Sequence, residues 1–542
     1  MSTTAPAPAL TVPAPPARRF PTRAPWPLLA TGALVALLFA GPLLYLVIRT
    51  VGFGSSALDV LGSDDAAGPL LRTLLLATCV SAACALLGTT LAWLVVRTDL
   101  PGRRVFRVLL VVPLVIPSFV GALALQAAFA TGGLVDELAA FDVAPRIEGF
   151  WAAFAVLTLL SYPYVYLPVA ARLAVLPPAL EESARSLGRT PAEVFRSVVL
   201  PQTIGAIAAG SLLTFLYCAS EFGAVSVVRY DTLTLRIEAT RLFDRETSVT
   251  LSLVLAVFAL AVVALERVLA RRRAPIEAVG AGRPAHQTEL GRWRGPALGV
   301  VLAVLFFALV APVAVLADRA LGGDDVRFGA AGSGDLLEPV LNTAWVSAVT
   351  AFIAVAVVLP LAYLTVRHRS RVGGAVNTLV VAGFALPGLV IALALVFWVL
   401  GTPVVGGLYQ SYPLLVFAYV VHFGAQAMRT SQVAVSGLPR RLEDAARSLG
   451  AGRWRRLRTV ELPLLAPGLA AGAGLVLLAT MKELPATLLL APTGFETLAT
   501  RIWSANEAGL LARAGLTSLA LVALSAVLTW LVTIRRMDRL DA

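Results

Sequence analysis

Apolar blocks, each about 20 residues long, recur along the chain from residue 26 to its end. An α-helix rises 1.5 Å per residue, so about 20 apolar residues cross the ~30 Å of hydrocarbon in a membrane. The composition agrees, because 58% of the 542 residues are hydrophobic and 14% are charged, whereas soluble domains are about 45–50% apolar and about 25% charged. We therefore expect an integral membrane protein.

The pattern of these blocks predicts an all-α chain with twelve membrane-spanning helices. The expected spans cover residues 27–48, 71–96, 107–130, 150–174, 202–226, 249–269, 296–317, 341–366, 376–400, 412–430, 464–488 and 511–534. Membrane lipid is thus the first partner that the sequence implies.

Arginine-rich loops alternate with acidic ones between these spans. The basic loops lie near residues 97–107, 185–196, 271–273, 367–371, 453–458 and 535–539, and acidic ones near 59–65, 136–142 and 324–338. Because Lys and Arg gather on the cytoplasmic side of membrane proteins, both termini are expected inside the cell. The net charge of +12 follows from these loops, so no nucleic-acid partner is expected.

Two sequence blocks occur twice, in the same order. Leu91–Arg97 reappears as Leu361–Arg367, 270 residues later (367 − 97), and Leu180–Gly188 as Leu442–Gly450, 262 residues later (450 − 188). The chain is therefore expected to be a tandem duplication of a six-helix unit, with about eight extra residues in the first copy near 131–149. An even number of spans in each unit makes the two copies parallel in the membrane.

This repeat divides the chain into four expected sections. They are a disordered cytoplasmic tail over 1–25, a first six-helix domain over 26–270, a cytoplasmic linker over 271–295 and a second six-helix domain over 296–542.

The duplicated loop between the fourth and fifth spans of each unit carries the most specific pattern. In the first copy a short helix is expected to end near Gly188, which tolerates a left-handed conformation. Thr190 and Glu193 then have the spacing of a capping box with Pro191 at the first helical position, and Pro201 marks the start of the next span. Two short helices at an angle, outside the bilayer, would present charged side chains to a partner.

This loop resembles the cytoplasmic loop of the permease subunits of binding-protein-dependent ABC importers. That family has Glu-Ala-Ala, three residues, Gly, nine residues and Ile-x-Leu-Pro. The matching residues are Glu182, Ala184, Gly188, Leu200 and Pro201 in the first copy and Ala445, Ala446, Gly450, Leu462 and Pro463 in the second, with Ser183, Val198, Asp444 and Val460 as departures. The resemblance implies a type I importer fold and assigns the loop to contact with an ATPase. We add its flanking charges Glu181, Arg185, Glu443 and Arg447 to the candidate coupling residues.

The same resemblance implies two protein partners and a bacterial inner-membrane location. The partners are an ABC ATPase dimer and an extracytoplasmic substrate-binding protein. A phosphate-binding loop needs a lysine, and the only lysine, Lys482, lies in an expected span. We therefore expect no nucleotide-binding domain, no cofactor bound by this chain and no enzymatic activity of its own, with ATP used by the partner.

Three charged residues inside expected spans are candidates for the translocation path. Glu221 and Glu483 are equivalent in the two copies, and Lys482 precedes the second of them. Charges within spans are costly and face a pathway or a partner. A structural role, with each carboxylate satisfied by a neighbouring helix, is the alternative. Adjacent helical residues do not face each other, so a direct Lys482–Glu483 pair is not expected.

The cargo is indicated by resemblance alone. Lys482–Leu490 and Phe495–Thr500 resemble the ferric-iron importer permeases, which favours Fe(III), whereas thiamine and phosphonate importers share the fused architecture. His286, His368 and His422 are scattered, so we interpret them as loop or packing residues. A secondary transporter with twelve helices is the alternative from another class. It would place the long internal loop between the halves, whereas the patterned loop here lies within each half.

Overall fold

A computed structural model describes residues 25–131, 133–135, 146–271, 287–322, 336–368 and 371–531. The expected tail over 1–24, most of the linker (272–286) and the basic C-terminal segment lie outside these residues, as do the acidic loops at 136–142 and 324–335. The predictions made for those segments stay predictions.

The first copy consists of helices joined by short turns. Its elements are α1 (Trp26–Gly52), α2 (Ser55–Leu61), α3 (Asp64–Arg97), α4 (Arg103–Leu109), η1 (Val112–Val115), α5 (Ser118–Phe129), α7 (Phe150–Ser161), α8 (Pro163–Ala174), α9 (Pro178–Ser186), α10 (Pro191–Val194), η2 (Phe195–Val199), α11 (Leu200–Ala219), α12 (Gly223–Val227), α13 (Leu233–Thr240) and α14 (Arg245–Arg271).

The second copy repeats this order. Its elements are η3 (Gly291–Trp293), α15 (Arg294–Leu305), η4 (Phe306–Val310), α16 (Ala311–Gly322), α18 (Leu337–Arg367), α19 (Arg371–Ala385), α20 (Gly388–Leu400), η6 (Gly406–Leu408), α21 (Tyr412–Gly437), α22 (Arg440–Ser448), α23 (Arg453–Arg456), η7 (Leu457–Glu461), α24 (Leu462–Met481), α25 (Pro485–Leu490), α26 (Leu498–Glu507) and α27 (Leu511–Thr529). All regular elements of the described part of the chain are thus helices, as expected, with one isolated β-bridge between Thr98 and Thr288.

The described residues of every expected span fall mainly on helix, but four of the twelve spans are broken: 107–130, 202–226, 376–400 and 464–488. Nine of the described helices are long and apolar enough to cross a membrane alone. The third expected span bends by 90° between Arg103–Val115 and Ser118–Phe129, and the ninth divides into α19 and α20 on either side of Pro387. Proline lacks an N–H and holds the residue before it out of the helical region, so continuous spans over 107–130 and 376–400 were wrong expectations. The spans expected over 202–226 and 464–488 are likewise interrupted, after Ala219 and after Met481. The tenth expected span lies on the continuous helix α21, which is not among the nine.

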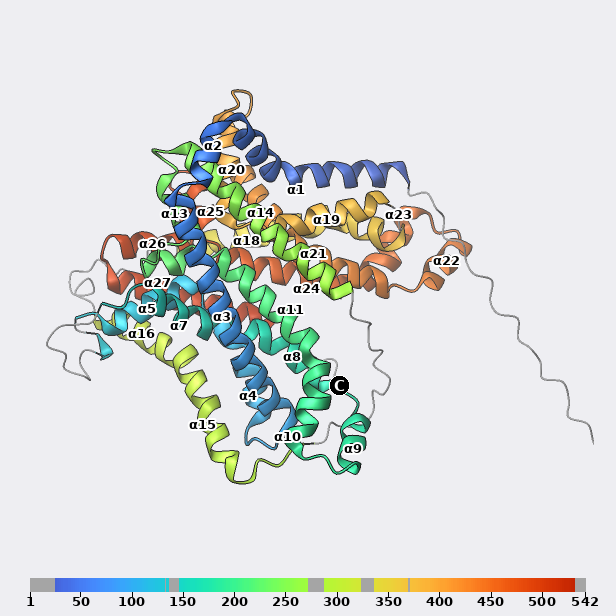
Figure 1. The fold of residues 1–542 in the computed structure, drawn as a ribbon. Coiled ribbons are helices and arrows are strands. Elements are labelled where there is room, and N and C mark those ends of the chain that lie inside the picture. The colour runs from blue at the N-terminus through green and yellow to red at the C-terminus, as the bar shows by residue number, and fades with distance from the viewer. Residues whose placement is uncertain are drawn as a thin grey trace, which may run out of the picture.

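The hydrophobic residues form two clusters that do not follow the division of the sequence. Helix α1, from the first copy, packs against α18, α19 and α20 of the second. Conversely, α16 packs against α5 and η4 against α7. Figure 1 shows the blue α1 lying along the yellow and orange helices, while the yellow-green α15 and α16 run beside the first copy. The first span of each copy therefore completes the core of the other.

Candidate functional site

The loop helix α9 has the capped C-terminus that its sequence predicts. Gly188 follows it with φ of +80°, in the left-handed region. The N–H of Gly188 donates to Arg185 O at 2.8 Å, and that of Arg189 donates to Ala184 O at 3.2 Å. These bonds satisfy carbonyls that the helix end leaves free. Ala184, within α9, is buried on the inner face of this helix.

Helix α22 repeats this geometry in the second copy. Gly450 has φ of +76°, and its N–H donates to Arg447 O at 2.9 Å. Ala446 is buried, as Ala184 is. The sequence pattern thus produces the same helix and turn twice, and Figure 1 shows α9 and α22 on the right-hand side of the molecule, away from α2, α13 and α26.

The outward faces of these two helices carry apolar as well as charged side chains. Leu187 and its repeat equivalent Leu449 are 81% and 87% exposed. Leu180 and Leu442, and the carboxylates Glu182 and Asp444, are also exposed, and Asp444 lies 3.8 Å from Arg447. Exposed leucines at matched positions are typical of a surface that binds a partner.

Two of the charged candidate coupling residues, Glu181 and Glu443, form ion pairs with long helices instead. Glu181 forms an ion pair with Arg97, the last residue of α3, and both side chains are buried. Glu443 lies 3.0 Å from Arg367, the last residue of α18. Arg185 stands 3.7 Å from Glu181 on the same helix. Each loop helix is therefore fastened to the end of a long span.

The second helix of each loop is continuous with the next span. The expected capping box is confirmed, since the Thr190 N–H donates to Glu193 Oε2 at 2.8 Å and the Glu193 N–H to Thr190 Oγ1 at 3.4 Å. The hydrogen bonds from the Thr190 N–H and hydroxyl lower the pKa of Glu193. However, α10 runs directly into η2 and α11, so a separate second short helix was a wrong expectation.

Leu200, Pro201 and their equivalents Leu462 and Pro463 lie in the first turn of α11 and α24. The five residues before each pair form a π-helical turn, η2 or η7. Such turns interrupt the regular ladder of helical hydrogen bonds and are frequent at functional sites.

Glu221 lies beyond the end of α11, at a break before α12, and not within a continuous span as expected. Its Oε1 accepts hydrogen bonds from Ser118 Oγ at 2.9 Å and from the Ala224 N–H at 2.9 Å. Ser118 is the first residue of α5, after the bend at Pro117. One buried carboxylate thus joins the two broken helices of the first copy.

Glu483 occupies the equivalent break between α24 and α25. Its Oε1 accepts from the Ala486 N–H at 3.1 Å. A Cβ atom placed on Gly388, which begins α20 after Pro387, would stand 2.6 Å from this oxygen. Gly388 is the repeat equivalent of Ser118. In the first copy the Ser118 hydroxyl donates to the Glu221 carboxylate. In the second copy there is no side chain at this position, and the Glu483 carboxylate lies close to the Gly388 backbone instead.

The two breaks lie near each other in the interior. A Cβ atom on Gly223 would stand 3.5 Å from both Glu221 Oε1 and Leu484 Cδ2. Lys482 crosses between the copies, and its Nζ donates to Leu114 O at 2.9 Å. Leu114 precedes Pro117 by three residues, and the proline has no N–H to donate to the preceding turn. The Lys482 side chain therefore donates a hydrogen bond to the first copy, in agreement with the expectation that it does not pair directly with Glu483.

His422 also belongs to this region, although its isolation in the sequence suggested a packing role. Its Nε2 lies 4.0 Å from Glu483 Oε2, and its ring packs 4.3 Å from that of Phe423. Its proximity to Glu483 had no sequence signal, because 61 residues separate the two (483 − 422). Within the described residues, no group of three His, Cys, Asp or Glu side chains is placed to hold a metal ion.

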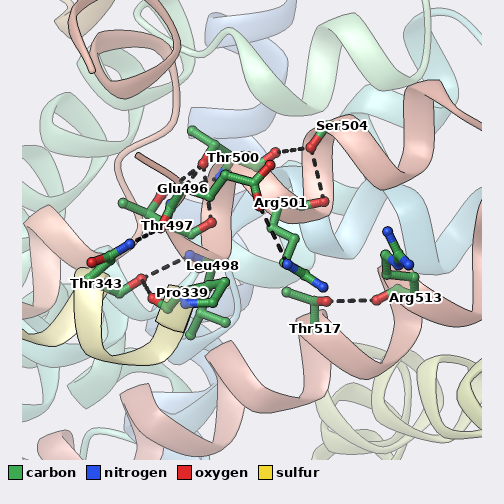
Figure 2. A network of polar contacts seen from close by, with 11 residues as sticks. Pro339, Thr343, Glu496, Thr497, Leu498, Thr500, Arg501, Ser504, Arg513 and Thr517 are labelled. Carbon is green, nitrogen blue, oxygen red and sulfur yellow. Dashed lines mark hydrogen bonds and ion pairs between the residues drawn. The ribbon is translucent and has the colours of Figure 1, made fainter. Parts of the chain in front are cut away.

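A threonine fastens the segment that follows each break to a long span. Thr343 Oγ1 accepts from the Leu498 N–H at 2.8 Å and donates to Pro339 O at 2.7 Å, as Figure 2 shows. Thr73 makes the same two bonds in the first copy, with the Leu233 N–H at 2.9 Å and Pro69 O at 2.8 Å. The sequence analysis missed this repeated contact.

Comparison with known proteins identifies a family that matches both copies and a relative that covers most of the chain. The family described as "Binding-protein-dependent transport system inner membrane component" matches twice, at residues 85–275 and 353–537. The Fe(3+)-transport system permease protein FbpB 2 of Haemophilus influenzae is 31% identical over 518 residues, which cover 94% of this chain and 99% of that protein.

Relatives with other names match one part of the chain. The molybdenum transport system permease protein ModB of Mycobacterium tuberculosis is 33% identical over 242 residues, 43% of this chain and 89% of that protein. The sulfate transport system permease protein CysT of Salmonella typhimurium is 34% identical over 169 residues, 31% of this chain and 60% of that protein. The chain thus belongs to the binding-protein-dependent transport system inner membrane components, as a fused, two-repeat ABC importer permease.

Proposed function

We propose that this permease imports Fe(III), driven by a separate ATPase dimer that binds α9 and α22 on the cytoplasmic side. An extracytoplasmic binding protein delivers the cargo to the opposite face. The permease binds no cofactor of its own, and ATP is used by the partner. Both termini lie in the cytoplasm in this proposal, because Arg97 and Arg367, in two of the arginine-rich segments, contact α9 and α22.

The ATPase contact is supported by one observation above all. The same short helix, with an exposed leucine at its capped end, occurs at the same place in both copies. A symmetric ATPase dimer needs two such equivalent surfaces. The candidates for direct contact are the exposed Glu182, Gly188, Asp444, Gly450 and the leucines after each helix. Glu181 and Glu443 are not candidates for direct contact; they hold α9 and α22 in place through their ion pairs with Arg97 and Arg367.

The iron cargo is supported by the relative that spans the chain and by the chemistry of the two breaks. Glu221 is buried and the Glu483 side chain is 10% exposed. Two carboxylates favour a cation over an oxyanion such as sulfate or molybdate. Fe(III) is a hard ion that prefers oxygen ligands. We place the translocation path along these breaks, with Lys482 holding the two copies together beside it.

The test is uptake by proteoliposomes that contain the full chain, its ATPase and the iron-loaded binding protein. We expect radioactive iron uptake that requires ATP, with no uptake of sulfate, molybdate, thiamine or phosphonate. Uptake driven by a proton gradient without the ATPase would instead identify a secondary transporter. Preferred uptake of another cargo would refute the iron assignment while leaving the ATPase contact intact.

Substitution of the path carboxylates refines this test. Glu483→Gln keeps the shape but removes the charge, and a lost interaction of about 1.4 kcal/mol corresponds to about tenfold lower uptake at limiting iron. Glu507→Gln is the matched control, because Glu507 accepts a hydrogen bond from Trp503 on the exposed end of α26. Equal iron uptake by both variants would place the path elsewhere.

A further inference from the structure

Two long helices, α3 and α18, carry an anchor near each end. In α3 these are Thr73 and Arg97, and in α18 they are Thr343 and Arg367. The spacing is 24 residues in both helices (97 − 73 and 367 − 343), which corresponds to roughly 36 Å along a helix axis. The same two attachments at the same spacing suggest a mechanical role.

At one end, each arginine fastens a loop helix to the long helix. Arg97 pairs with Glu181 of α9 and donates to Leu173 O at 3.3 Å. Arg367 pairs with Glu443 of α22 and donates to Leu438 O at 2.7 Å. Each guanidinium thus holds both the loop helix and the backbone that leads into it. Because the fork of donors is planar and rigid, this contact fixes orientation as well as distance.

At the other end, each threonine holds the segment after a broken helix. Leu233, whose N–H binds Thr73, begins α13 and follows α12 and Glu221. Leu498, whose N–H binds Thr343, begins α26 and follows α25 and Glu483. In Figure 2 the Thr343 side chain points to the start of α26, in the network that also contains Glu496 and Arg501.

We propose that α3 and α18 are levers that carry movement of α9 and α22 to the broken helices that hold Glu221 and Glu483. The inference rests on the proposed function, since it is the ATPase that would move the loop helices. A loop helix displaced by the ATPase moves its arginine, the arginine moves the long helix, and the threonine moves the segment after the break. The anchors are positioning residues that touch neither ATP nor cargo.

The two levers differ in one respect. Helix α18 contains Pro360 between its anchors, whereas α3 has no proline between Thr73 and Arg97. A proline removes one backbone hydrogen bond and permits bending. The lever of the first copy is therefore the stiffer one, and its pair of anchors is also the more deeply buried at the arginine end.

The test uses the full chain with its ATPase and binding protein in proteoliposomes, and measures cargo transported per ATP hydrolysed. Thr343→Val and Glu443→Gln each break one end of the α18 lever. We expect each to lower the ratio on the order of tenfold, with ATPase copurification and ATP hydrolysis retained. Thr343→Ser keeps the hydroxyl and should keep the parental ratio.

Double variants make the test specific to a lever. Thr343→Val with Glu443→Gln should be no worse than either alone, because one lever cannot be broken twice. Thr343→Val with Glu181→Gln should multiply the two losses, because it breaks both levers. Multiplied losses within one helix would overturn the inference, as would single variants with the parental ratio.

Matched controls separate the lever from folding and from the ATPase contact. Thr214→Val removes an equally buried hydroxyl whose hydrogen bond, among the described residues, goes to Gly210 O of its own helix at 3.0 Å, and should leave the ratio unchanged. Glu443→Gln lies at a partly exposed pair and tests the lever even where Thr343→Val fails to insert. Loss of ATPase copurification in Glu443→Gln would show that Glu443 is needed for ATPase binding, and would overturn the inference that it acts through α18. Absence of copurification in the parent would instead refute the proposed function.

Discussion

At the residue scale, the proposed function depends on a few polar side chains with partners distant in the sequence, and on glycines that have a left-handed φ or closely contact another side chain. The Lys482 side chain donates a hydrogen bond to Leu114 O, which belongs to the first copy. Arg97 and Arg367 hold loop helices that the sequence alone would place free in solvent. In each case the partner is distant in the sequence, so the residue type was a clue to function but its contact was not predictable.

Gly188 and Gly450 provide the sharpest test of the loop helices. Their φ angles of +80° and +76° are in the left-handed region, although no atom lies within 4 Å of an added Cβ. Valine there costs roughly 1–2 kcal/mol in backbone strain and distorts the docking surface. We expect Gly188→Val and Gly450→Val to reduce ATPase copurification and transport severalfold at parental levels in the membrane.

The matched control is Gly299→Val in α15. A Cβ atom added at Gly299 would also meet no atom within 4 Å, but the φ of Gly299 is not in the left-handed region. It should copurify with the ATPase normally. If both loop variants also bound the ATPase and transported at parental rates, α9 and α22 would have no coupling role.

Gly388 tests whether the position of the Glu483 carboxylate matters. A Cβ atom there would stand 2.6 Å from Glu483 Oε1 and 3.3 Å from His422 Nε2. Gly388→Ala should displace the carboxylate from the Ala486 N–H, at an overpacking cost of roughly 1–3 kcal/mol, and lower iron uptake severalfold. Gly374→Ala, with open space around it, should not. Parental iron uptake by Gly388→Ala would show that transport does not depend on the exact position of the Glu483 carboxylate.

At the element scale, the end of the linker forms a short strap on the end of α3. The Thr288 N–H donates to Arg97 O at 2.8 Å, and the Leu290 N–H donates to Asp99 Oδ1 at 2.9 Å. Asp99 also pairs with Arg294, which begins α15. The strap thus joins the first span of the second copy to the lever of the first, beside the Arg97–Glu181 pair.

The stability of this strap should fall at acidic pH, when Asp99 becomes protonated. The Leu290 N–H, and secondly Arg294, hold the pKa of Asp99 below its ordinary value of 3.8. A lowered pKa stabilises the folded state above the unfolded value, and that stabilisation is lost as the pH falls through the folded pKa. Hydrogen exchange at Leu290 should therefore show constant protection through neutral pH, with loss only below about pH 4.

Asp99→Asn should weaken this protection already at neutral pH, because the ion pair with Arg294 is lost. Asp59→Asn, at an exposed position of α2, should leave it unchanged. Full protection of Leu290 in Asp99→Asn would show that the strap does not need the carboxylate.

At the scale of the whole molecule, the two copies are interlocked. Helix α1 completes the cluster around α18 to α20, and α16 packs against α5. Helix α14, the last of the first copy, contacts α19 and α20, while α27 contacts η1. Neither half can bury all of its apolar surface without the other.

This interlocking predicts how a divided chain behaves. A chain opened between Gly280 and Ala281 should assemble from two coexpressed pieces, because the contacts between the copies do not require a continuous linker. Affinity purification of one piece should recover the other in about equal amount. A first piece lacking α1 should recover much less of the second, whereas loss of residues 2–20 should have no effect. Failure of the pieces to copurify would show that the linker is essential to assembly.

Much of the architecture followed from local sequence patterns. The described residues of the twelve expected spans fall mainly on helix, and the repeat offset predicted that Glu221 and Glu483 occupy equivalent positions. The glycine cap at Gly188 and the capping box at Thr190 were also predicted, because each depends on residues within a few positions. The breaks were not predicted, since hydropathy continues without change across Pro117 and Pro387.

The sequence by itself determined that this chain crosses a membrane many times, is duplicated, and belongs with the importer permeases. Those conclusions rest on apolar length, repetition and a short motif, all of which are local. Only the tertiary structure decided which span packs on which copy, where the helices break, and which side chains join α3 and α18 to their neighbours. An apolar face is equally satisfied by lipid or by another helix, so hydropathy carries no information about its partner.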